Sequence, residues 1–322
     1  MHQCAVLRVL IKVGKGFLAS KMLDCRAERF ADLAEVLGLT PMQVTLFDRF
    51  NGLRDVGWDN DASLLDLLLA ATERLTALPG NEHRVRYVLH ARAFAVVVPF
   101  PHNPLHELTD RIGLGHAEAF TVTQQSCATG LLAIDIAGRL LAADGDSEAL
   151  ALVLAGEKAF TRDSRLLPET SVFSEGASAC LVAANGPRDR LLSYASLPRG
   201  DFDSDDAAEV AARFQRDYRG CLSAVMEAAT AQAGLRMEDI TLVLPHNVNM
   251  VSWRRVCKRM NFPVARVFLD NVARAGHVFC ADAFINYQTA RERGLLRPGD
   301  RYLIAAAGAG FGATFSAMVF EH

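Results

Sequence analysis

The sequence predicts an α/β protein built from two similar halves, and three observations support this. The chain has 322 residues, of which 51% are hydrophobic. That is enough to bury one large core or two fused ones, since single cores stop growing near roughly 250 to 300 residues. Segments typical of strands and helices alternate along the whole chain, which indicates a layered architecture. Both halves also show a similar succession of these segments, which favours an old internal duplication.

The first half contains the longest apolar helix of the chain. The patterns predict amphipathic helices at 26–37 and 62–78, strands at 86–90, 119–124 and 149–156, a buried helix at 128–142 and a small-residue stretch at 173–182. The helix at 128–142 is apolar apart from Asp135 and Arg139, an i,i+4 pair, so we expect it to be buried.

The second half repeats the alternation and ends in a glycine-rich segment. Strands are predicted at 241–244, 266–269, 302–307 and 314–320, and helices at 251–260 and up to Gly294, which can cap a C-terminus. The glycines at 308, 310 and 312 do not fit a phosphate loop, because no helix and further βα unit follow them. They fit a tight turn that offers backbone N–H groups to an oxyanion. By this succession, Cys127 and His277 occupy equivalent places in the two halves.

Turn-forming or acidic segments at 184–189 and 201–206 divide the chain near its middle. We therefore predict an N-terminal half over residues 1–186, which carries Cys127, and a C-terminal half over residues 187–322.

Composition narrows the possible functions. The formal net charge of -3 offers no basic footprint for nucleic acid and no polybasic patch for a membrane. The N-terminal apolar run is broken by Arg8 and Lys12, unlike a signal peptide, and we expect that no apolar stretch reaches membrane-spanning length. Seven cysteines without CxxC spacing indicate reduced thiols. We expect a cytoplasmic protein that binds neither nucleic acid nor a membrane.

Cys127 is the first candidate for chemistry. It follows a predicted strand and precedes the apolar helix, and a helix N-terminus favours negative charge, so its thiolate should be more available. The alternative is a buried structural thiol, which is the ordinary role of a cysteine.

His246 and His277 are the second and third candidates. His246 lies between a predicted strand and a helix, where α/β folds gather active-site groups, and His277 follows Gly276, which permits close backbone approach. Each alone could be an ordinary loop histidine. With Cys127 they supply a nucleophile, a proton shuttle and a hydrogen-bond donor, the parts that acyl transfer needs. HExxH, GxSxG and Walker lysine motifs are absent from the sequence.

With these residues aligned, the chain resembles the β-ketoacyl-acyl carrier protein synthase III branch of the thiolase superfamily over almost its whole length. Residues 126–130 resemble the nucleophile segment, 172–181 the dimer-core hairpin with its acidic residue at Glu175, 246–249 the His-Gln-Ala-Asn motif, and 307–320 the final hairpin. The resemblance implies a thiolase-like fold of two βαβαβαββ halves in an αβαβα arrangement. It also implies a homodimer.

The resemblance implies catalytic roles for Cys127, His246 and His277, an oxyanion hole from the backbone N–H groups of Cys127 and Ala309, and no metal. Expected substrate contacts are Asn249, Phe279, Phe50, Arg49, Arg54 and Arg254, and Phe94 and Phe100 join Phe50 and Phe279 as candidates for an acyl tunnel. The alternative for the four phenylalanines is a plain core role.

Two departures from the family pattern bear on function. His277 stands where the family carries a catalytic asparagine, which leaves a Cys-His-His set like that of elongating ketosynthases. Two neutral histidines can both donate hydrogen bonds to a thioester enolate, so decarboxylative condensation remains possible. The tryptophan that stacks on coenzyme A is absent near Leu46 and Phe47, and Phe50 replaces an arginine. We therefore expect no bound cofactor and an acyl donor on the phosphopantetheine of acyl carrier protein rather than coenzyme A.

Three functions follow. The first is a condensing enzyme of a fatty-acyl or polyketide pathway in specialised metabolism, which joins the acyl group of Cys127 to a malonyl-type thioester. The second is an acyltransferase that passes the acyl group to an alcohol or amine, with His246 as general base. The third is a non-catalytic partner subunit, against which the retention of Cys127 and His246 argues. Acyl length, acceptor and pathway stay open.

Overall fold

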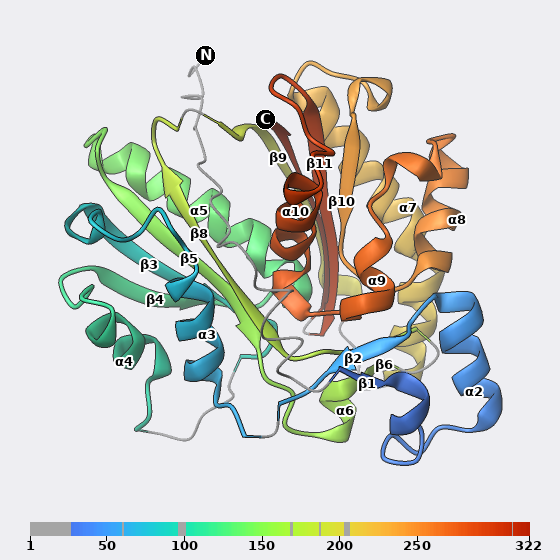
Figure 1. The fold of residues 1–322 in the computed structure, drawn as a ribbon. Coiled ribbons are helices and arrows are strands. Elements are labelled where there is room, and N and C mark those ends of the chain that lie inside the picture. Colours follow the sequence, from blue (N-terminus) through green and yellow to red (C-terminus); the bar gives the residue numbers. More distant parts are fainter. Residues whose placement is uncertain are drawn as a thin grey trace.

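A computed structural model describes residues 27–59, 61–95, 101–167, 170–186, 188–202, 207–310 and 312–322 of the chain. Two four-stranded mixed sheets form the framework, with helices between them and on their outer faces (Figure 1). The N-terminal positions 1–26, Phe100 and the acidic segment from 203 to 206 lie outside the described residues. The predicted α/β architecture is confirmed.

The first sheet has the strand order β4-β3-β5-β8. Its strands are β3 (Val85–Ala91), β4 (Glu118–Val122), β5 (Leu150–Glu157) and β8 (Gly176–Ala183). β3 runs parallel to β4 and β5, whereas β8 is antiparallel to β5. Every residue of β5 and β8 is buried, as expected where helices cover both faces of a sheet.

The second sheet has the order β10-β11-β12-β9. Its strands are β9 (Arg190–Arg199), β10 (Leu242–Pro245), β11 (Arg301–Gly310) and β12 (Gly312–Glu321). β10 is parallel to β11, and β12 is antiparallel to both its neighbours, so β10, β11 and β12 repeat the pairing of β3, β5 and β8. The strand predicted at 266–269 is wrong. Only a single bridge from Val267 to Val243 forms, because η7 (Val264–Arg266) is a 3-10 turn.

Helices complete a five-layered αβαβα arrangement (Figure 1). On the outer face of the first sheet lie α3 (Leu64–Glu73) and α4 (Pro104–Arg111), and outside the second lie α7 (Ala207–Gln232) and α8 (Met250–Met260). Between the sheets lie α5 (Thr129–Asp144) and α10 (Asp282–Glu292). The two central helices therefore place their N-terminal ends between the sheets.

Helix α5 is largely buried, as predicted, and Arg139 and Asp135 form the expected ion pair at 2.8 Å. By length and composition alone, the segment Ser126–Asp144 is nevertheless long and apolar enough to cross a membrane. The prediction that no apolar stretch reaches membrane-spanning length is therefore wrong. Of its apolar window, 56% is buried inside the fold. A central position between two sheets accounts for the same hydropathy.

Short elements connect these layers. They are β1 (Ala27–Arg29), η1 (Phe30–Leu33), α2 (Pro41–Thr45), the π-helical turn η2 (Leu46–Asn51), β2 (Asp55–Gly57), η3 (Glu82–Arg84), η4 (Ser126–Ala128), α6 (Arg162–Arg165), β6 (Leu166–Leu167), β7 (Ser171–Val172), η5 (Gly200–Phe202), η6 (Met237–Asp239), α9 (Asp270–Ala275) and η8 (Phe279–Ala281). The helix predicted at 26–37 is wrong, because β1 pairs with β2 and Phe30 packs against Phe47. Tertiary pairing has overridden the helical spacing there.

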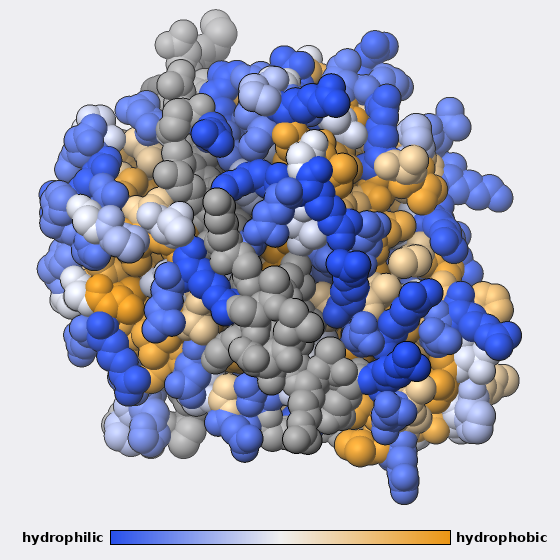
Figure 2. Space-filling view, in the orientation of Figure 1, coloured by the Kyte–Doolittle hydropathy of each residue, from blue (hydrophilic) through white to orange (hydrophobic). Residues whose placement is uncertain are grey.

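Hydrophilic side chains cover most of the face drawn in Figure 2, with smaller hydrophobic areas between them. At the corner formed by α2 and η2, Met42 is 80% exposed and Phe50 is 58% exposed. Single exposed apolar side chains of this kind are ordinary features of a protein surface.

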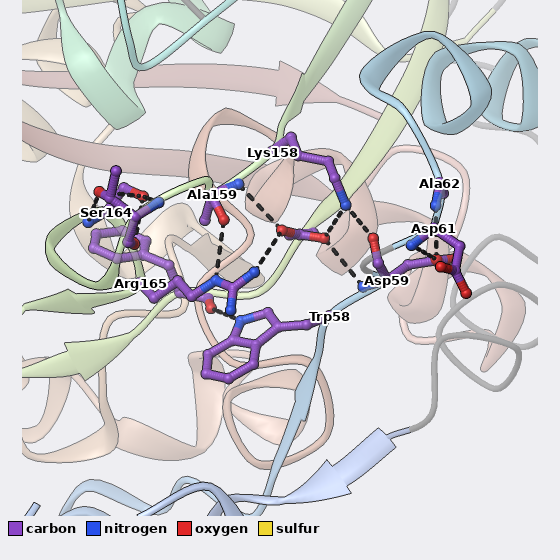
Figure 3. A network of polar contacts seen from close by, with 11 residues as sticks. Trp58, Asp59, Asp61, Ala62, Lys158, Ala159, Ser164 and Arg165 are labelled. Atoms are coloured by element: carbon purple, nitrogen blue, oxygen red, sulfur yellow. Dashed lines mark hydrogen bonds and ion pairs between the residues drawn. The ribbon is translucent and has the colours of Figure 1, made fainter. Parts of the chain in front are cut away.

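A buried carboxylate, Glu175, joins the end of β5 to the segment after β2. Figure 3 labels its partners Lys158, Arg165 and Asp59. The carboxylate lies 2.7 Å from Lys158 Nζ and 3.6 Å from Arg165 Nη2, and it accepts the backbone N–H of Asp59 at 3.1 Å. The Arg165 guanidinium also lies over the ring of Trp58, 4.5 Å from its centroid. Because Glu175 is fully buried and paired with two cations, it holds these two segments together.

Removing this charge should therefore destabilise the fold. Glu175→Gln keeps the shape but leaves the Lys158 ammonium buried without its anion, so we expect the free energy of unfolding to fall by about 3 to 5 kcal/mol. Glu107→Gln, at an exposed i,i+4 pair with Arg111, is the control and should cost only about 0.5 kcal/mol. Urea unfolding measures both, and equal losses would contradict the role of Glu175.

Candidate active site

Cys127 lies in η4, between β4 and the buried helix α5. Its side chain is 7% exposed. Just before it, Gln124 and Ser126 have positive φ angles of 76° and 48°. Residues with a side chain seldom adopt such angles, and they cluster at functional sites. The thiol is thus held at the start of a buried helix, at the end of an unusually shaped turn.

Strand β11 of the second sheet lies directly against this turn. A Cβ atom placed on Gly308 would lie 2.3 Å from the carbonyl oxygen of Gln125 and 2.9 Å from the backbone nitrogen of Cys127. Only glycine permits this approach. Ala309 is the next residue and pairs with Ala313 across the hairpin, so the predicted oxyanion partner lies one residue beyond the contact with the nucleophile segment.

A cavity of about 380 Å³ opens beside the same contact. It is lined by Ala93, Phe94, Ala95, Gln124, Gln125, Ser126, Gly308, Ala309, Gly312 and Thr314. Glu157 at the end of β5 fixes one wall, because its carboxylate accepts the backbone N–H groups of Ala93 and Phe94. The cavity therefore lies against the turn that immediately precedes Cys127.

His246 follows β10 and is buried at 2% exposure. Its Nδ1 faces the carbonyl oxygen of Ala305 at 3.4 Å, and its Nε2 lies 3.0 Å from the hydroxyl of Tyr218. Since a carbonyl only accepts, Nδ1 carries the proton and Nε2 accepts from Tyr218. Burial, followed by the charge of His277, lowers the pKa of His246 to about 3. The ring is neutral, and both nitrogens are engaged within the protein.

His277 has the opposite charge state. Its ring lies 5.9 Å from that of His246, measured between centroids, and its Nδ1 is 2.5 Å from a carboxylate oxygen of Asp282. Burial opposes protonation, but Asp282, followed by Cys127, outweighs burial and raises the pKa of His277 to about 10. His277 is therefore an imidazolium at neutral pH. It lies close enough to Cys127 for that side chain to contribute to the raised pKa.

Sequence reasoning missed Asp282, the residue that connects these groups. Its carboxylate also accepts the backbone N–H groups of Val278 and Asn247, each at 2.6 Å. An aspartate in the first turn of a helix is an ordinary surface feature, so nothing in the pattern singled it out. Its spacing five residues after His277 was the only available signal.

Phe279, a predicted substrate contact, lies in a buried cluster with Cys127 and Ala159. Its ring stacks on Phe173 with centroids 4.5 Å apart and meets the edge of Phe94 at 5.3 Å. Phe279 also has a positive φ of 48°.

The positive φ of Phe279 corrects the predicted equivalence of Cys127 and His277. In each half, a residue with a φ of 48° precedes a cysteine and an alanine in a 3-10 turn that leads into a central helix. Cys127 thus corresponds to Cys280, and His277 lies three residues earlier.

Most of the other predicted substrate contacts lie at the surface. Arg49 and Phe50 on η2, together with Arg54 and Arg254, are exposed. Asn249 is buried, but its side-chain oxygen caps α8 through the N–H of Ser252 and its amide nitrogen donates to the carbonyl oxygen of Thr170. Asn249 therefore positions the segment that follows His246, and its amide is engaged within the fold.

A basic groove, which sequence reasoning also missed, lies between α7 and α8. Its volume is about 640 Å³, and it is lined by Arg216, Asp217, Arg219, Gly220, Cys221, Arg255, Lys258 and Arg259. The spacing of Arg255, Lys258 and Arg259 on one face of a predicted helix was the signal that could have revealed it. Tyr218, on the same stretch of α7, points inward to His246.

Comparison with known proteins agrees with this geometry. Residues 230–322 match the family model described as 3-oxoacyl-[acyl-carrier-protein] synthase III C terminal. The β-ketoacyl-acyl carrier protein synthase III of Nitratidesulfovibrio vulgaris is 27% identical over 225 residues, which cover 62% of this chain and 66% of that protein. The matched segments span about two thirds or less of the first curated relatives.

Solved structures show the same fold over nearly the whole chain. The structure titled ChlB3, an acyltransferase, aligns with a TM-score of 0.82 at 20% identity and covers 98% of this chain and 97% of its own. The 3-oxoacyl-acyl carrier protein synthase III of Aquifex aeolicus aligns with a TM-score of 0.78 at 17% identity and 99% coverage of both chains. The predicted thiolase-like fold and the relation to the synthase III-like branch are confirmed.

Gly308 offers a test of the contact that holds Cys127. Gly308→Ala should displace the turn before Cys127, lowering the free energy of unfolding by about 1 to 3 kcal/mol and slowing alkylation of the Cys127 thiol by iodoacetamide. Gly200→Ala is the matched control, since a Cβ there meets nothing within 4 Å. If the two variants behave alike in urea unfolding and in alkylation, the contact does not position Cys127.

The raised pKa of His277 predicts how stability depends on pH. A histidine whose pKa is higher in the folded state stabilises the fold fully below its unfolded pKa near 6.5, and the contribution is lost as pH rises towards about 10. The difference in unfolding free energy between wild type and His277→Gln should therefore shrink from pH 6.5 to pH 10. Urea unfolding across that range measures it, and a difference that grows with pH would contradict the assignment.

Proposed function

We propose that this chain is a β-ketoacyl-acyl carrier protein synthase III-like enzyme that transfers an acyl group through a thioester on Cys127. The observation that carries the proposal is the convergence of a buried cysteine with a neutral and a charged histidine, the latter backed by Asp282. A cysteine beside an imidazolium is the arrangement that makes a thiolate available for attack.

In the proposed first step, the Cys127 sulfur attacks the carbonyl carbon of a thioester donor. The new bond to sulfur replaces the bond to the donor thiol, which leaves with the proton that His277 holds. The backbone N–H groups of Cys127 and Ala309 are proposed to bind the oxyanion in between. The cavity beside Gly308 and Phe94 is proposed to accommodate the acyl chain.

In the proposed second step, a malonyl-type thioester loses carbon dioxide and its carbanion attacks the acyl carbonyl, so that Cys127 leaves as a thiolate. His246 and His277 are proposed to donate hydrogen bonds to the thioester enolate. The relation to the synthase III-like branch supports this condensing function, in a fatty-acyl or polyketide pathway.

One observation favours a second function, transfer of the acyl group to an alcohol or amine without decarboxylation. Both ring nitrogens of His246 are engaged within the protein, so it cannot donate to an enolate without giving up a bond. His277, after releasing its proton to the donor thiol, can instead take one from a hydroxyl or amine. The general-base role then moves from His246 to His277.

We further propose acyl carrier protein as the donor, with coenzyme A as the alternative. The basic groove of α7 and α8 suits an anionic partner, and Arg254, Arg49 and Arg54 are exposed and can meet a phosphopantetheine phosphate. A homodimer, a cytoplasmic location and the absence of nucleic-acid or membrane partners are proposed from the family relation and the composition.

The test is intact-mass spectrometry of the protein after incubation with acyl-acyl carrier protein and acyl-coenzyme A thioesters of several chain lengths, followed by a malonyl thioester chase. We expect an acyl adduct on wild type and none on Cys127→Ala. Cys180→Ala is the matched control, because Cys180 is also buried but lies in β8 and burial raises the pKa of its thiol.

The chase separates the two functions. Discharge of the adduct with release of carbon dioxide supports condensation, and discharge only by alcohols or amines supports transfer. An adduct that forms equally on Cys127→Ala, or no adduct from any donor, would refute the acyl-Cys127 proposal and favour a non-catalytic partner subunit.

A further inference from the structure

Asp282 is the first residue of α10 and is 1% exposed. One oxygen, Oδ2, lies 2.5 Å from His277 Nδ1 and accepts the N–H of Asn247 at 2.6 Å, while Oδ1 accepts the N–H of Val278 at 2.6 Å. A single carboxylate therefore holds the segment that carries His277 and the residue that follows His246.

The charge of this carboxylate is balanced by His277. Among the residues that the structure describes, Asp282 forms its ion pair with His277 and with no lysine or arginine. A carboxylate buried without a counter-charge costs several kcal/mol, so the pair favours a protonated imidazole. The other titratable groups that face His277 are Cys127 of η4 and His246, which follows β10.

The same helix also holds the main chain on both sides of His246. One turn after Asp282, the Asn286 amide donates to the carbonyl oxygen of Pro245 at 2.7 Å and to the side-chain oxygen of Asn247 at 2.8 Å. Asn286 is itself fixed by Asn271 at 2.9 Å. Two neighbouring turns of α10 thus set the position of both histidines.

We propose that Asp282 is the positioning residue of the site. It holds His277 protonated at Nδ1 with its other nitrogen facing Cys127, and it fixes the position of His246 through the neighbouring residue Asn247. The proposal deepens the proposed function and rests on it for the role of Cys127. The state that Asp282 favours is the ion pair that forms when the Cys127 thiol gives its proton to Nε2 of His277, a thiolate beside an imidazolium, and forming this pair needs no other reactant.

The first measurement uses the wild-type chain alone. In ¹⁵N-histidine-labelled protein, long-range ¹H–¹⁵N spectra identify the His277 signals by their absence from His277→Asn. We expect both ring nitrogens of His277 to stay protonated from pH 6 to pH 8. A neutral His277 ring, or one that titrates near the ordinary value of about 6.5, would overturn the proposal. This measurement does not depend on whether an Asp282 variant folds.

The second measurement compares Asp282→Asn with wild type. An asparagine offers one acceptor atom and no charge, so the rate of iodoacetamide alkylation at Cys127, followed by peptide mass spectrometry, should fall about tenfold at pH 6. The difference should narrow as pH rises. A merely structural role would lower the rate equally at every pH.

Asp189→Asn is the matched control. Asp189 is also a buried aspartate that contacts a histidine, His322, at 2.7 Å, and it accepts from Tyr287 and Tyr302. The Asp189→Asn variant should lose a comparable amount of stability and keep the pH profile of Cys127 alkylation seen in wild type. If Asp282→Asn keeps that profile too, the positioning role is refuted, whether or not an acyl adduct forms. If the profile changes but no adduct forms with any donor, the positioning role stands and the proposed acyl transfer fails.

Discussion

The close approach of β11 to the turn that carries Cys127 is the contact on which the rest of the site depends. The thiol comes from the first half of the chain, and both histidines come from the second. A side chain at Gly308 would overlap the backbone of Gln125, so the two halves meet at backbone distance without an intervening side chain. The N-terminal ends of the two central helices then face the same small volume (Figure 1).

Two histidines in one buried space would repel each other if both were charged, and the surroundings resolve this by separating their pKa values. His246 packs between Tyr218 and Trp253 and faces only neutral hydrogen-bond partners, so burial keeps it uncharged. His277 is equally buried but has Asp282 at its Nδ1, which reverses the effect of burial. Pairs of titratable groups with opposed pKa values are a mark of acid–base sites. The charge of His277 also reinforces the neutrality of His246.

The sequence predicted those parts of the molecule that local pattern determines. The apolar helix that became α5, the hairpin of β11 and β12, and the position of Cys127 all follow from periodicity, glycine spacing and motif. The helix expected at 26–37 was wrong because its side chains found partners in β2 and around Phe47, which no local spacing encodes. Asp282 was missed for the same reason, since only the three-dimensional fold reveals that this carboxylate is buried. The basic groove required two helices, α7 and α8, to be brought together from distant segments.

The histidine at position 277 adds a group that can exchange a proton to the site. An asparagine, which the resemblance noted in the sequence implies for this position, donates a hydrogen bond but cannot exchange a proton near neutral pH. His277 with Asp282 can both donate and accept, so the site gains a proton carrier next to Cys127. That carrier serves the release of a donor thiol in either proposed function. The two functions use this proton carrier differently at the second step. Decarboxylation needs only a hydrogen-bond donor to the enolate, whereas attack by an alcohol or amine needs a base. The position of the Tyr218 hydroxyl against His246 leaves His277 as the histidine able to act as that base.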